Sequence, residues 1–323
     1  MKPEIVILER INTSEIAILS KFADIKFYLG LSRKKYLEKI KNATAIIIKS
    51  VTKVDSELLD NAKKLKIVAR AGTGLDNIDT KLLKKKKIKL ISTPKANAIS
   101  TAEFTLMQIL NLCKRMPDVY PKLQKKDFRR HLFEGRELSQ LSVGILGVGN
   151  VGIEVAKRLR PFGCKIYAHD INLKNIKKFK RLGGKYVASL SKLISKIDIL
   201  TVHSNLTEKN KKMINKDQFN KIKKNIILIN CARAELIDDN ALIKAIKAKK
   251  IIYAALDVIH PEPNYDQVKK NSRHKLLKIK NIIYTPHLAA STIDAQRKIS
   301  QELIFKLIKV LKFENNKMIA PDL

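Results

Sequence analysis

Short apolar runs, many of them rich in β-branched residues, alternate along the chain with longer segments that carry many lysines. Such runs are typical of strands buried on both faces, and their alternation with helical segments is typical of βαβ units that form a parallel sheet. The pattern predicts strands at residues 5–8, 45–48, 67–70, 88–91, 143–146, 165–168, 197–202, 226–229, 252–256 and 282–284. We therefore expect an α/β protein with two Rossmann-like, doubly wound parallel sheets.

A helical pattern over residues 102–113 joins the two halves of the chain. Residues 100–103 have the sequence of a capping box, which places the start of the helix there, and Pro117 lies just beyond its last apolar position. Residues 116–138 lack a clear period and predict a long surface loop or an arm that contacts a partner. A second helical pattern covers residues 292–313, and we expect this helix to pack on the first half.

The charge of the chain is its most unusual property. Its 323 residues are enough for about two domains, and its 66 Lys and Arg against 30 Asp and Glu give a formal net charge of +36. A charge of this size in general points to nucleic acid or another anionic surface. Here the lysines are spread over nearly every predicted helix and accompany many Ile and Asn residues, as an A/T-rich coding sequence produces. We interpret the charge as compositional, with nucleic-acid binding as the alternative.

Cysteine content and hydropathy restrict the cellular compartment that we expect for the protein. Cys113, Cys164 and Cys231 are too far apart for a disulfide framework or a zinc site, which favours a reducing environment. No stretch approaches the roughly 18 apolar residues of a membrane span, and the N-terminus lacks the pattern of a signal peptide. The sequence thus predicts a cytoplasmic protein of enzyme size that needs neither a metal nor a membrane.

Residues 143–152 read VGILGVGNVG, a predicted strand that runs into a glycine-rich turn and a helix. Gly147 permits the tight turn, Gly149 lets a pyrophosphate approach the backbone, and Gly152 allows close packing of helix on strand. Asp170 follows the next strand, 18 residues after the last glycine, where a carboxylate accepts hydrogen bonds from ribose hydroxyls and repels a 2′-phosphate. The motif predicts an NAD site, and a glycine-lined turn without a ligand is the alternative.

Polar residues follow the last four predicted strands where each strand ends. They are His203 and Ser204, residues 230–233, Asp257, and residues 285–287. Because ligands of open α/β sheets bind beyond the carboxyl ends of the strands, we expect these residues to surround the reacting end of the dinucleotide. Oxidation of a 2-hydroxy acid needs a proton acceptor, a partner that tunes this acceptor, and a cation for the substrate carboxylate.

His287, Glu262 and Arg233 match these three functions. An imidazole titrates near neutral pH, so His287 can take the hydroxyl proton, and Glu262 would raise the pKa of that imidazole by pairing with its charged form. Arg233 offers two parallel hydrogen bonds to a carboxylate. Each residue by itself is as readily a capping, loop or surface residue, so the prediction rests on their joint placement beside the dinucleotide motif.

In order and spacing, these motifs resemble those of the D-isomer-specific 2-hydroxyacid dehydrogenases over nearly the whole chain. The matching segments are GVGNVG with Asp170, NCAR at 230–233, LDV at 256–258, PEP at 261–263 and TPHLAAST at 285–292. The resemblance implies that Arg233, Glu262 and His287 are catalytic. It also implies cofactor contacts at Gly147, Gly149, Asn150, Val151, Gly152, Asp170, His203, Ser204, Cys231, Ala232, Asp257, Ala289 and Ala290.

The resemblance also bears on domains and assembly. The family's split arrangement implies a flavodoxin-like substrate domain of residues 1–99 and 292–323, into which the NAD-binding Rossmann domain, residues 100–291, is inserted. A homodimer or homotetramer is implied as well, because the family commonly dimerises through the nucleotide domain. The chain departs from the family pattern at Asn205, usually proline, and at Ala234, usually glycine. We expect strain at Ala234 if its position needs a positive φ.

Polar groups also follow two predicted strands of the first half. The candidate substrate-binding residues are Lys49, Ser50, Gly72, Thr73, Gly74 and Asn97, with Arg233 from the second half. Adjacent N–H groups of the glycine loop predict an anion nest for a carboxylate, and Lys49 offers a point charge to a phosphate. Asn97, just ahead of the joining helix, either binds the substrate or fixes a hinge.

Around these residues the chain resembles the family branch that oxidises 3-phospho-D-glycerate to 3-phosphooxypyruvate, the first step of serine biosynthesis. That branch typically has arginine at the position of Lys49. Two alternatives stay open, a glyoxylate or hydroxypyruvate reductase and a non-catalytic, corepressor-like NAD sensor on the same fold. The resemblance ends near residue 320, so we expect no C-terminal regulatory domain and no feedback inhibition through one.

Overall fold

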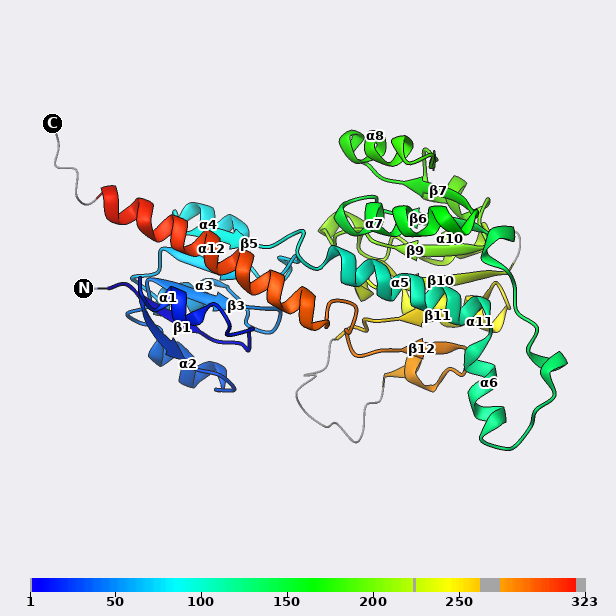
Figure 1. Cartoon of the computed structure of the whole chain (residues 1–323), viewed down its shortest axis with the longest axis horizontal. Helices are drawn as coiled ribbons and strands as arrows, with labels where there is room; N and C mark the ends of the chain where they lie inside the picture. Colours follow the sequence, from blue (N-terminus) through cyan, green and yellow to red (C-terminus); the bar gives the residue numbers. More distant parts are fainter. Residues whose placement is uncertain (1, 223–224, 262–273, 318–323) are drawn as a thin grey trace. The chain divides into compact units, whose positions relative to one another are not determined.

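The computed structural model describes residues 2–222, 225–261 and 274–317 (Figure 1). The chain forms two compact units. Unit 1 consists of Met1–Asn97 and Thr292–Leu323, and unit 2 consists of Ala98–Ser291. The first division falls two residues before the one expected from the sequence, and the second falls at the expected position.

Unit 1 contains a five-stranded parallel sheet in the order β2-β1-β3-β4-β5. Its strands are β1 Glu4–Ile7, β2 Asp24–Phe27, β3 Ala45–Ile48, β4 Ile67–Arg70 and β5 Lys89–Ser92. Its helices are α1 Ile16–Leu19, α2 Arg33–Lys39, α3 Ser56–Asn61, α4 Thr80–Lys85 and α12 Ile293–Lys317. This strand order is that of flavodoxin-like folds.

The last helix of the chain, α12, completes the core of unit 1 (Figure 1). Ile299, Leu303 and Leu307 of α12 are almost fully buried and form one apolar cluster with Ile5 and Ile7 of β1. Burial of a side chain of this size contributes roughly 1.5–3 kcal/mol. Residues of α2, α3 and α4 form a second cluster in the same unit. The predicted packing of the C-terminal helix on the first half is therefore confirmed.

Unit 2 contains a seven-stranded parallel sheet in the order β12-β11-β10-β9-β6-β7-β8. Its strands are β6 Ser142–Leu146, β7 Lys165–His169, β8 Lys185–Tyr186, β9 Ile199–Val202, β10 Ile226–Asn230, β11 Ile251–Leu256 and β12 Ile282–Tyr284. Its α-helices are α5 Ala98–Cys113, α6 Met116–Leu123, α7 Asn150–Leu159, α8 Leu173–Arg181, α9 Leu190–Ile194, α10 Lys216–Asn220 and α11 Asp239–Lys247. Its 3₁₀-helices are η1 Arg130–Phe133, η2 Leu138–Gln140, η3 Arg160–Phe162, η4 Glu208–Asn210, η5 Ala234–Leu236 and η6 Lys275–Lys278.

The strand order of unit 2 is that of a Rossmann fold, with β6 as the first strand of the unit. One apolar cluster packs α5 and α7 against the sheet, and a second cluster packs α9, α10 and α11 against it. The predicted fold class, an α/β protein with two doubly wound parallel sheets, is confirmed.

The sequence pattern missed two strands, β2 and β8, which both lie at sheet edges. No residue of β2 is fully buried, and β8 has only two residues. Strands at a sheet edge need not be apolar on both faces, so neither segment produces the continuous apolar run that identified the others.

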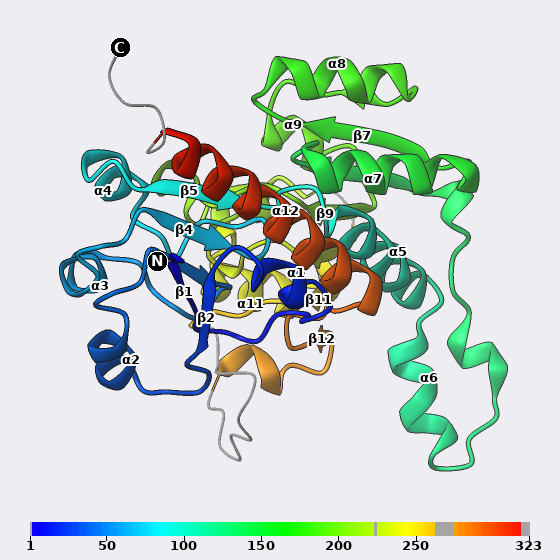
Figure 2. The same ribbon diagram turned by 60° about the vertical axis from the view of Figure 1, so that its left-hand side comes forward.

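Two predictions around the joining helix are wrong. Helix α5 begins at Ala98, so the predicted capping box lies inside the helix, and the Ser100 hydroxyl instead donates to the Ala289 carbonyl oxygen at 2.8 Å. Met116–Leu123, predicted as a loop, forms α6, with Pro117 in the first turn, where its missing N–H is tolerated. No residue of α6 is buried, and α6 projects from the sheet of unit 2 (Figure 2). No helix in the described parts of the chain combines the length and apolarity of a membrane span.

Candidate active site

The strand order of unit 2 fixes where a nucleotide can bind. The order reverses at β6, which lies between β7 and β9. Ligands of open α/β sheets bind at such a point, outside the carboxyl ends of the strands. The carboxyl end of β6 leads into the glycine-rich turn, and those of β9, β10, β11 and β12 lead into the segments that contain His203, Arg233, Asp257 and His287. The fold thus gathers these segments at one edge of the sheet.

The three glycines of the turn each meet a separate steric demand. Gly147 has φ of +89°, and a Cβ there would lie 2.8 Å from the Ser204 hydroxyl oxygen. A Cβ on Gly152 would lie 2.1 Å from the Gly147 carbonyl oxygen. Gly149, the N-cap of α7, has no atom within 4 Å of the place of a Cβ and makes no side-chain cap. The open space at Gly149, at a helix N-terminus, fits the pyrophosphate of a dinucleotide.

Asp170 connects the glycine turn to the end of β7. Its carboxylate oxygens accept hydrogen bonds from the Val148 and Asn172 main-chain N–H groups, both at 2.7 Å. Each carboxylate oxygen has a second lone pair, so Asp170 can also accept hydrogen bonds from ribose hydroxyls. The backbone bonds fix the negative charge beside the turn, where it would repel a 2′-phosphate.

Asp257 organises the segment that carries His287. The Asp257 carboxylate is buried and accepts hydrogen bonds from the Thr285 hydroxyl at 2.6 Å, the Leu288 N–H at 2.8 Å and the Ala289 N–H at 2.9 Å. Its main-chain oxygen accepts the His287 N–H at 2.8 Å. Burial raises the pKa of the Asp257 carboxyl.

These bonds surround a residue with an unusual backbone. His287 has φ of +56°, in the left-handed region that residues other than glycine rarely adopt. Such a conformation persists where the surrounding structure imposes it. The hydrogen bonds of Asp257 on both sides of His287 provide that constraint, and they set the position of a half-buried imidazole at the carboxyl edge.

Arg233 lies in a turn shaped by the Asn230 side chain. The Asn230 amide donates to the Arg233 carbonyl oxygen at 2.8 Å and accepts the Ala232 N–H at 3.0 Å. The half-buried Arg233 guanidinium donates to the Ala232 carbonyl oxygen at 2.8 Å. Ala234, the departure from the family glycine, begins η5 and is not among the residues with positive φ. The expected strain at Ala234 is therefore absent.

His203 and Ser204 lie against Gly147 of the glycine turn, and Cys231 follows β10. Burial lowers the pKa of His203 to about 3, and its Nε2 lies 2.8 Å from the Thr201 hydroxyl oxygen, so this imidazole is neutral. The Ser204 hydroxyl donates to the Leu146 carbonyl oxygen at 3.3 Å. Burial raises the pKa of the Cys231 thiol to about 12, which leaves it protonated and unreactive. These residues shape the site without adding a charge to it.

The candidate substrate residues of unit 1 follow β3 and β4. The Lys49 ammonium donates to the Gln296 side-chain oxygen at 3.0 Å, and the Thr73 hydroxyl donates to the Asn97 side-chain oxygen at 2.7 Å. Gly72 has φ of +138°, and its N–H donates to the Arg70 carbonyl oxygen at 3.0 Å. The Gly72 N–H is thus used within the turn, and an anion nest there would rely on the amides that follow. Ser50 is exposed, and Asn150, Val151 and Ala290 are partly or fully accessible in unit 2.

Comparison with known proteins identifies the family. Residues 106–289 match the model of the D-isomer specific 2-hydroxyacid dehydrogenase NAD-binding domain. The chain belongs to this dehydrogenase family. Its cofactor is accordingly NAD, and the glycine turn with Asp170 is the part of unit 2 that fits this dinucleotide.

The relatives of this chain have several different names. The chain is 35% identical to D-3-phosphoglycerate dehydrogenase of Methanocaldococcus jannaschii, over 96% of this chain and 58% of that protein. It is 36% identical to hydroxypyruvate reductase of Thermotoga maritima, over 87% of this chain and 89% of that protein. A solved D-lactate dehydrogenase of Aquifex aeolicus with NAD and lactic acid matches with a TM-score of 0.86 and 26% identity, over 98% of this chain and 100% of that chain. The chain thus spans little more than half of the first of these relatives.

One residue near the candidate substrate residues was not predicted from the sequence. Arg70 ends β4 and is nearly buried, and a Cβ on Gly72 would lie 1.8 Å from its guanidinium. A charged residue at the end of an otherwise apolar strand is the signal that could have identified it. Glu262, assigned from the sequence as the partner of His287, lies outside the described residues.

Proposed function

We propose that the protein is an NAD-dependent dehydrogenase that interconverts 3-phospho-D-glycerate and 3-phosphooxypyruvate. The observation that carries this proposal is the fixed position of His287 at the carboxyl edge of unit 2, held by Asp257. Arg233 follows β10, separated from the strand that precedes His287 only by β11. A proton acceptor and a carboxylate-binding cation are thus offered at the edge that carries the dinucleotide turn.

The proposed roles follow from the chemistry of the reaction. In the oxidising direction, the C2–H bond of the substrate breaks with its electron pair, the C2–O bond becomes a double bond and the hydroxyl proton is released. NAD accepts the hydride when it is bound. His287 takes the proton at an imidazole nitrogen, and Arg233 binds the carboxylate and so orients C2. We assign Glu262 to the charged form of His287 on the basis of the sequence alone.

The phosphorylated substrate is supported by two cations in unit 1. Lys49 follows β3, and Arg70 lies against the Gly72 turn, so this unit offers positive charge at the carboxyl edge of its own sheet. A lysine point charge is a better substitute for arginine when the ligand is a phosphate than when it is a carboxylate, because a carboxylate then loses its bidentate contact. We therefore assign residues 1–97 and 292–317 to the substrate domain and residues 98–291 to the NAD domain.

The projecting helix α6 supports a homodimer that forms through unit 2. No residue of α6 is buried, and the apolar side chains of Tyr120 and Phe128 in and after it are 60% and 75% exposed. Apolar patches of this kind mark interaction surfaces. Light scattering on the purified protein tests this assignment, and Tyr120→Asp with Phe128→Asp should give a monomer.

One parallel assay distinguishes the proposed function from its alternatives. NADH formation is followed with 3-phospho-D-glycerate, D-glycerate, D-lactate and glycolate at equal concentration. We expect kcat/KM for 3-phospho-D-glycerate to exceed the others by at least about tenfold, or roughly 1.4 kcal/mol. A preference for D-glycerate would instead support the hydroxypyruvate reductase named by the Thermotoga relative. NAD binding with no turnover of any substrate would support a non-catalytic NAD sensor.

A further inference from the structure

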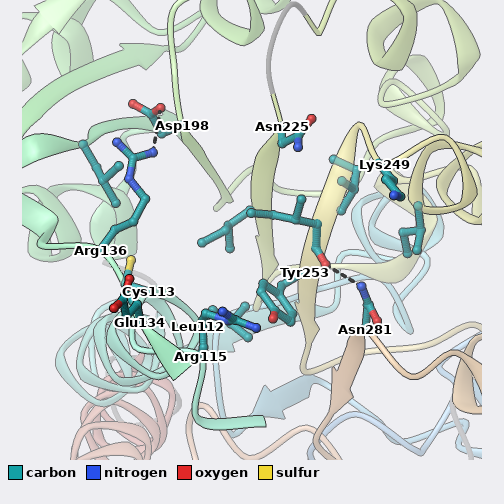
Figure 3. A pocket seen from close by; sticks show the side chains of 16 residues that line it. Leu112, Cys113, Arg115, Glu134, Arg136, Asp198, Asn225, Lys249, Tyr253 and Asn281 are labelled. Atoms are coloured by element: carbon teal, nitrogen blue, oxygen red, sulfur yellow. Dashed lines mark hydrogen bonds and ion pairs between the residues drawn. The ribbon is translucent and has the colours of Figure 1, made fainter. Parts of the chain in front are cut away.

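A cavity lies at the amino ends of several strands of the unit 2 sheet (Figure 3). The candidate active site lies at the opposite, carboxyl ends of the strands. The lining of the cavity includes Asp198, Asn225, Ile251 and Asn281, which precede or begin β9, β10, β11 and β12. These are the amino ends of parallel strands, whereas the nucleotide turn and His287 follow the carboxyl ends. The cavity is therefore separate from the candidate site for NAD and substrate.

The cavity has the size and the apolar floor of a small-molecule site. Its volume is about 430 Å³, within the roughly 300–1,000 Å³ typical of ligand pockets. Leu112 at the end of α5, Leu141 before β6, Ile227 of β10 and Ile252 of β11 supply apolar lining. Each belongs to the core of unit 2 or packs against it, so the floor is preformed by the sheet.

Charged groups surround this floor at the rim. Figure 3 shows Arg136 and Asp198 on one side of the cavity and Lys249 on the opposite side, with Arg115 and Tyr253 along a third side. Arg115 is bound to Asp118 at 3.0 Å. Arg136 is only loosely paired with Asp198, at 3.6 Å, and its side chain is 60% exposed. Asp198 also accepts the Ser142 N–H at 2.8 Å.

Lys249 and Glu134 are the charged rim residues that a ligand would meet without a partner among the described residues. Among the described residues, the Lys249 ammonium and the Glu134 carboxylate make no hydrogen bond or ion pair. The lining contains three cationic side chains, Arg115, Arg136 and Lys249, and the two carboxylates of Glu134 and Asp198. Asp118 pairs with Arg115 from beside the lining, so the charges at the rim balance locally. The whole chain carries a formal charge of +36, which sets a positive potential at the rim. The positive potential of the whole chain therefore favours an anion over a cation.

We propose that the cavity binds a small organic anion with an apolar body, such as an aromatic carboxylate. The body lies on the floor formed by Leu112, Ile227 and Ile252, and Lys249 holds the charged end, with Arg136 as a second cation. The ligand binds together with NAD, since the two sites lie at opposite edges of one sheet.

The binding test uses a fluorescent probe and three matched competitors. The probe is 8-anilinonaphthalene-1-sulfonate, a bulky aromatic anion, added to the full-length protein in saturating NAD. The competitors are 4-phenylbutyrate, 4-phenylbutanol and 4-phenylbutylamine, which share an apolar body and carry a negative, zero or positive charge. We expect the carboxylate to displace the probe at a concentration at least about threefold lower than the alcohol, and the amine to be weakest.

Three variants locate the site and its charge. Ile252→Trp places a large ring in the cavity from a strand position that accepts aromatic residues, and we expect it to abolish the saturable probe signal. Lys249→Gln should weaken 4-phenylbutyrate by about threefold to tenfold, and Glu134→Gln should leave it unchanged or strengthen it. Lys87→Gln is the matched control, because Lys87 is an exposed lysine of unit 1 with the same φ, +57°, as Lys249.

The outcomes separate this site from the active site and from a protein partner. NAD affinity and thermal midpoint should match the parent in every variant, which shows that Ile252→Trp folds. A saturable probe signal that is present without NAD but absent in saturating NAD would place the probe at the carboxyl edge and overturn the proposal. The proposal would also be overturned if the saturable signal survived Ile252→Trp, or if the three competitors bound with equal affinity. A probe signal that falls as the protein associates with a second copy would overturn it too.

Discussion

Asp257 and His287 are bound through two kinds of contact, because Asp257 accepts the His287 N–H with its main-chain oxygen and the next two N–H groups with its carboxylate. A backbone that residues other than glycine rarely adopt is thereby imposed on the proposed proton acceptor. Asp257 therefore fixes the backbone at His287.

Asp257→Asn tests this positioning role. An amide retains one acceptor but points its NH₂ group at an N–H donor, so we expect the free energy of unfolding to fall by about 1–3 kcal/mol. We also expect kcat to fall more than KM for the substrate rises, since the imidazole is displaced from its working position. Denaturant unfolding and steady-state kinetics measure the two effects. Thr285→Val, which removes only one of the three donors, should have a smaller effect on both.

His287→Ala should lower kcat by roughly 10²-fold or more, the range typical of a positioned acid–base group, while NAD affinity measured by calorimetry changes little. Arg233→Lys should raise KM and lower kcat, because an ammonium cannot reproduce the bidentate contact with a carboxylate. Near-normal kcat in His287→Ala with 3-phospho-D-glycerate would show that the acid–base role is assigned to the wrong residue.

Glu262→Gln should move the acid limb of the pH–rate profile to lower pH. A carboxylate that pairs with a protonated base stabilises the charged form of that base, so removal of the carboxylate should let the base form persist to lower pH. The profile of kcat/KM against pH measures the shift. An unchanged acid limb would remove Glu262 from the proposed constellation.

Asp170 should set the preference between the two nicotinamide cofactors. Calorimetry should show NAD bound at least about tenfold more tightly than NADP, or roughly 1.4 kcal/mol. Asp170→Ala should reduce this difference in affinity. Asp170→Asn removes the charge but keeps an oxygen that can accept the Val148 N–H, so it tests the effect of the charge alone. Equal affinity of the parent protein for both cofactors would contradict the assignment.

His203 should make stability depend on pH below neutrality. Its pKa is lowered to about 3 in the folded protein by burial, against about 6.5 when unfolded, so only the unfolded chain takes up a proton between these values. The free energy of unfolding should therefore fall with decreasing pH below 6.5, by up to about 1.4 kcal/mol per pH unit from this residue. Urea unfolding between pH 5 and pH 7 measures the slope. His203→Gln should reduce the slope, whereas His131→Gln, in an exposed segment, should not.

The sequence predicted best those features that depend on local apolar patterning. Residues 45–48 and 67–70 are buried on both faces and form β3 and β4 as predicted, whereas β2 at the sheet edge has no such pattern. The steric need for Gly147 and Gly152 also followed from the motif, because the motif itself describes a close backbone approach.

Tertiary contacts limited the rest of the prediction. Ser100 has the sequence of a cap, but a hydrogen bond to Ala289, far away in the chain, places it inside the helix. Likewise, nothing local to His287 indicates its positive φ, which the bonds of Asp257 impose. Arg70 could not be identified from the sequence, because its contact with the Gly72 turn depends on how that turn folds against it.

The divided sequence of unit 1 has a consequence for how the chain is made. The apolar cluster that contains residues of β1, β4, β5 and α12 joins segments that precede and follow unit 2 in the chain, so all of unit 2 is synthesised between them. A ribosome-bound chain can therefore complete unit 2 before α12 has been made to cover the apolar side chains of β4 and β5. Contacts of such long sequence separation form slowly, and exposed apolar strands invite aggregation in the meantime. Unit 1 thus becomes stable only after unit 2 has been synthesised, and of the two units it is the one that a chaperone would need to protect.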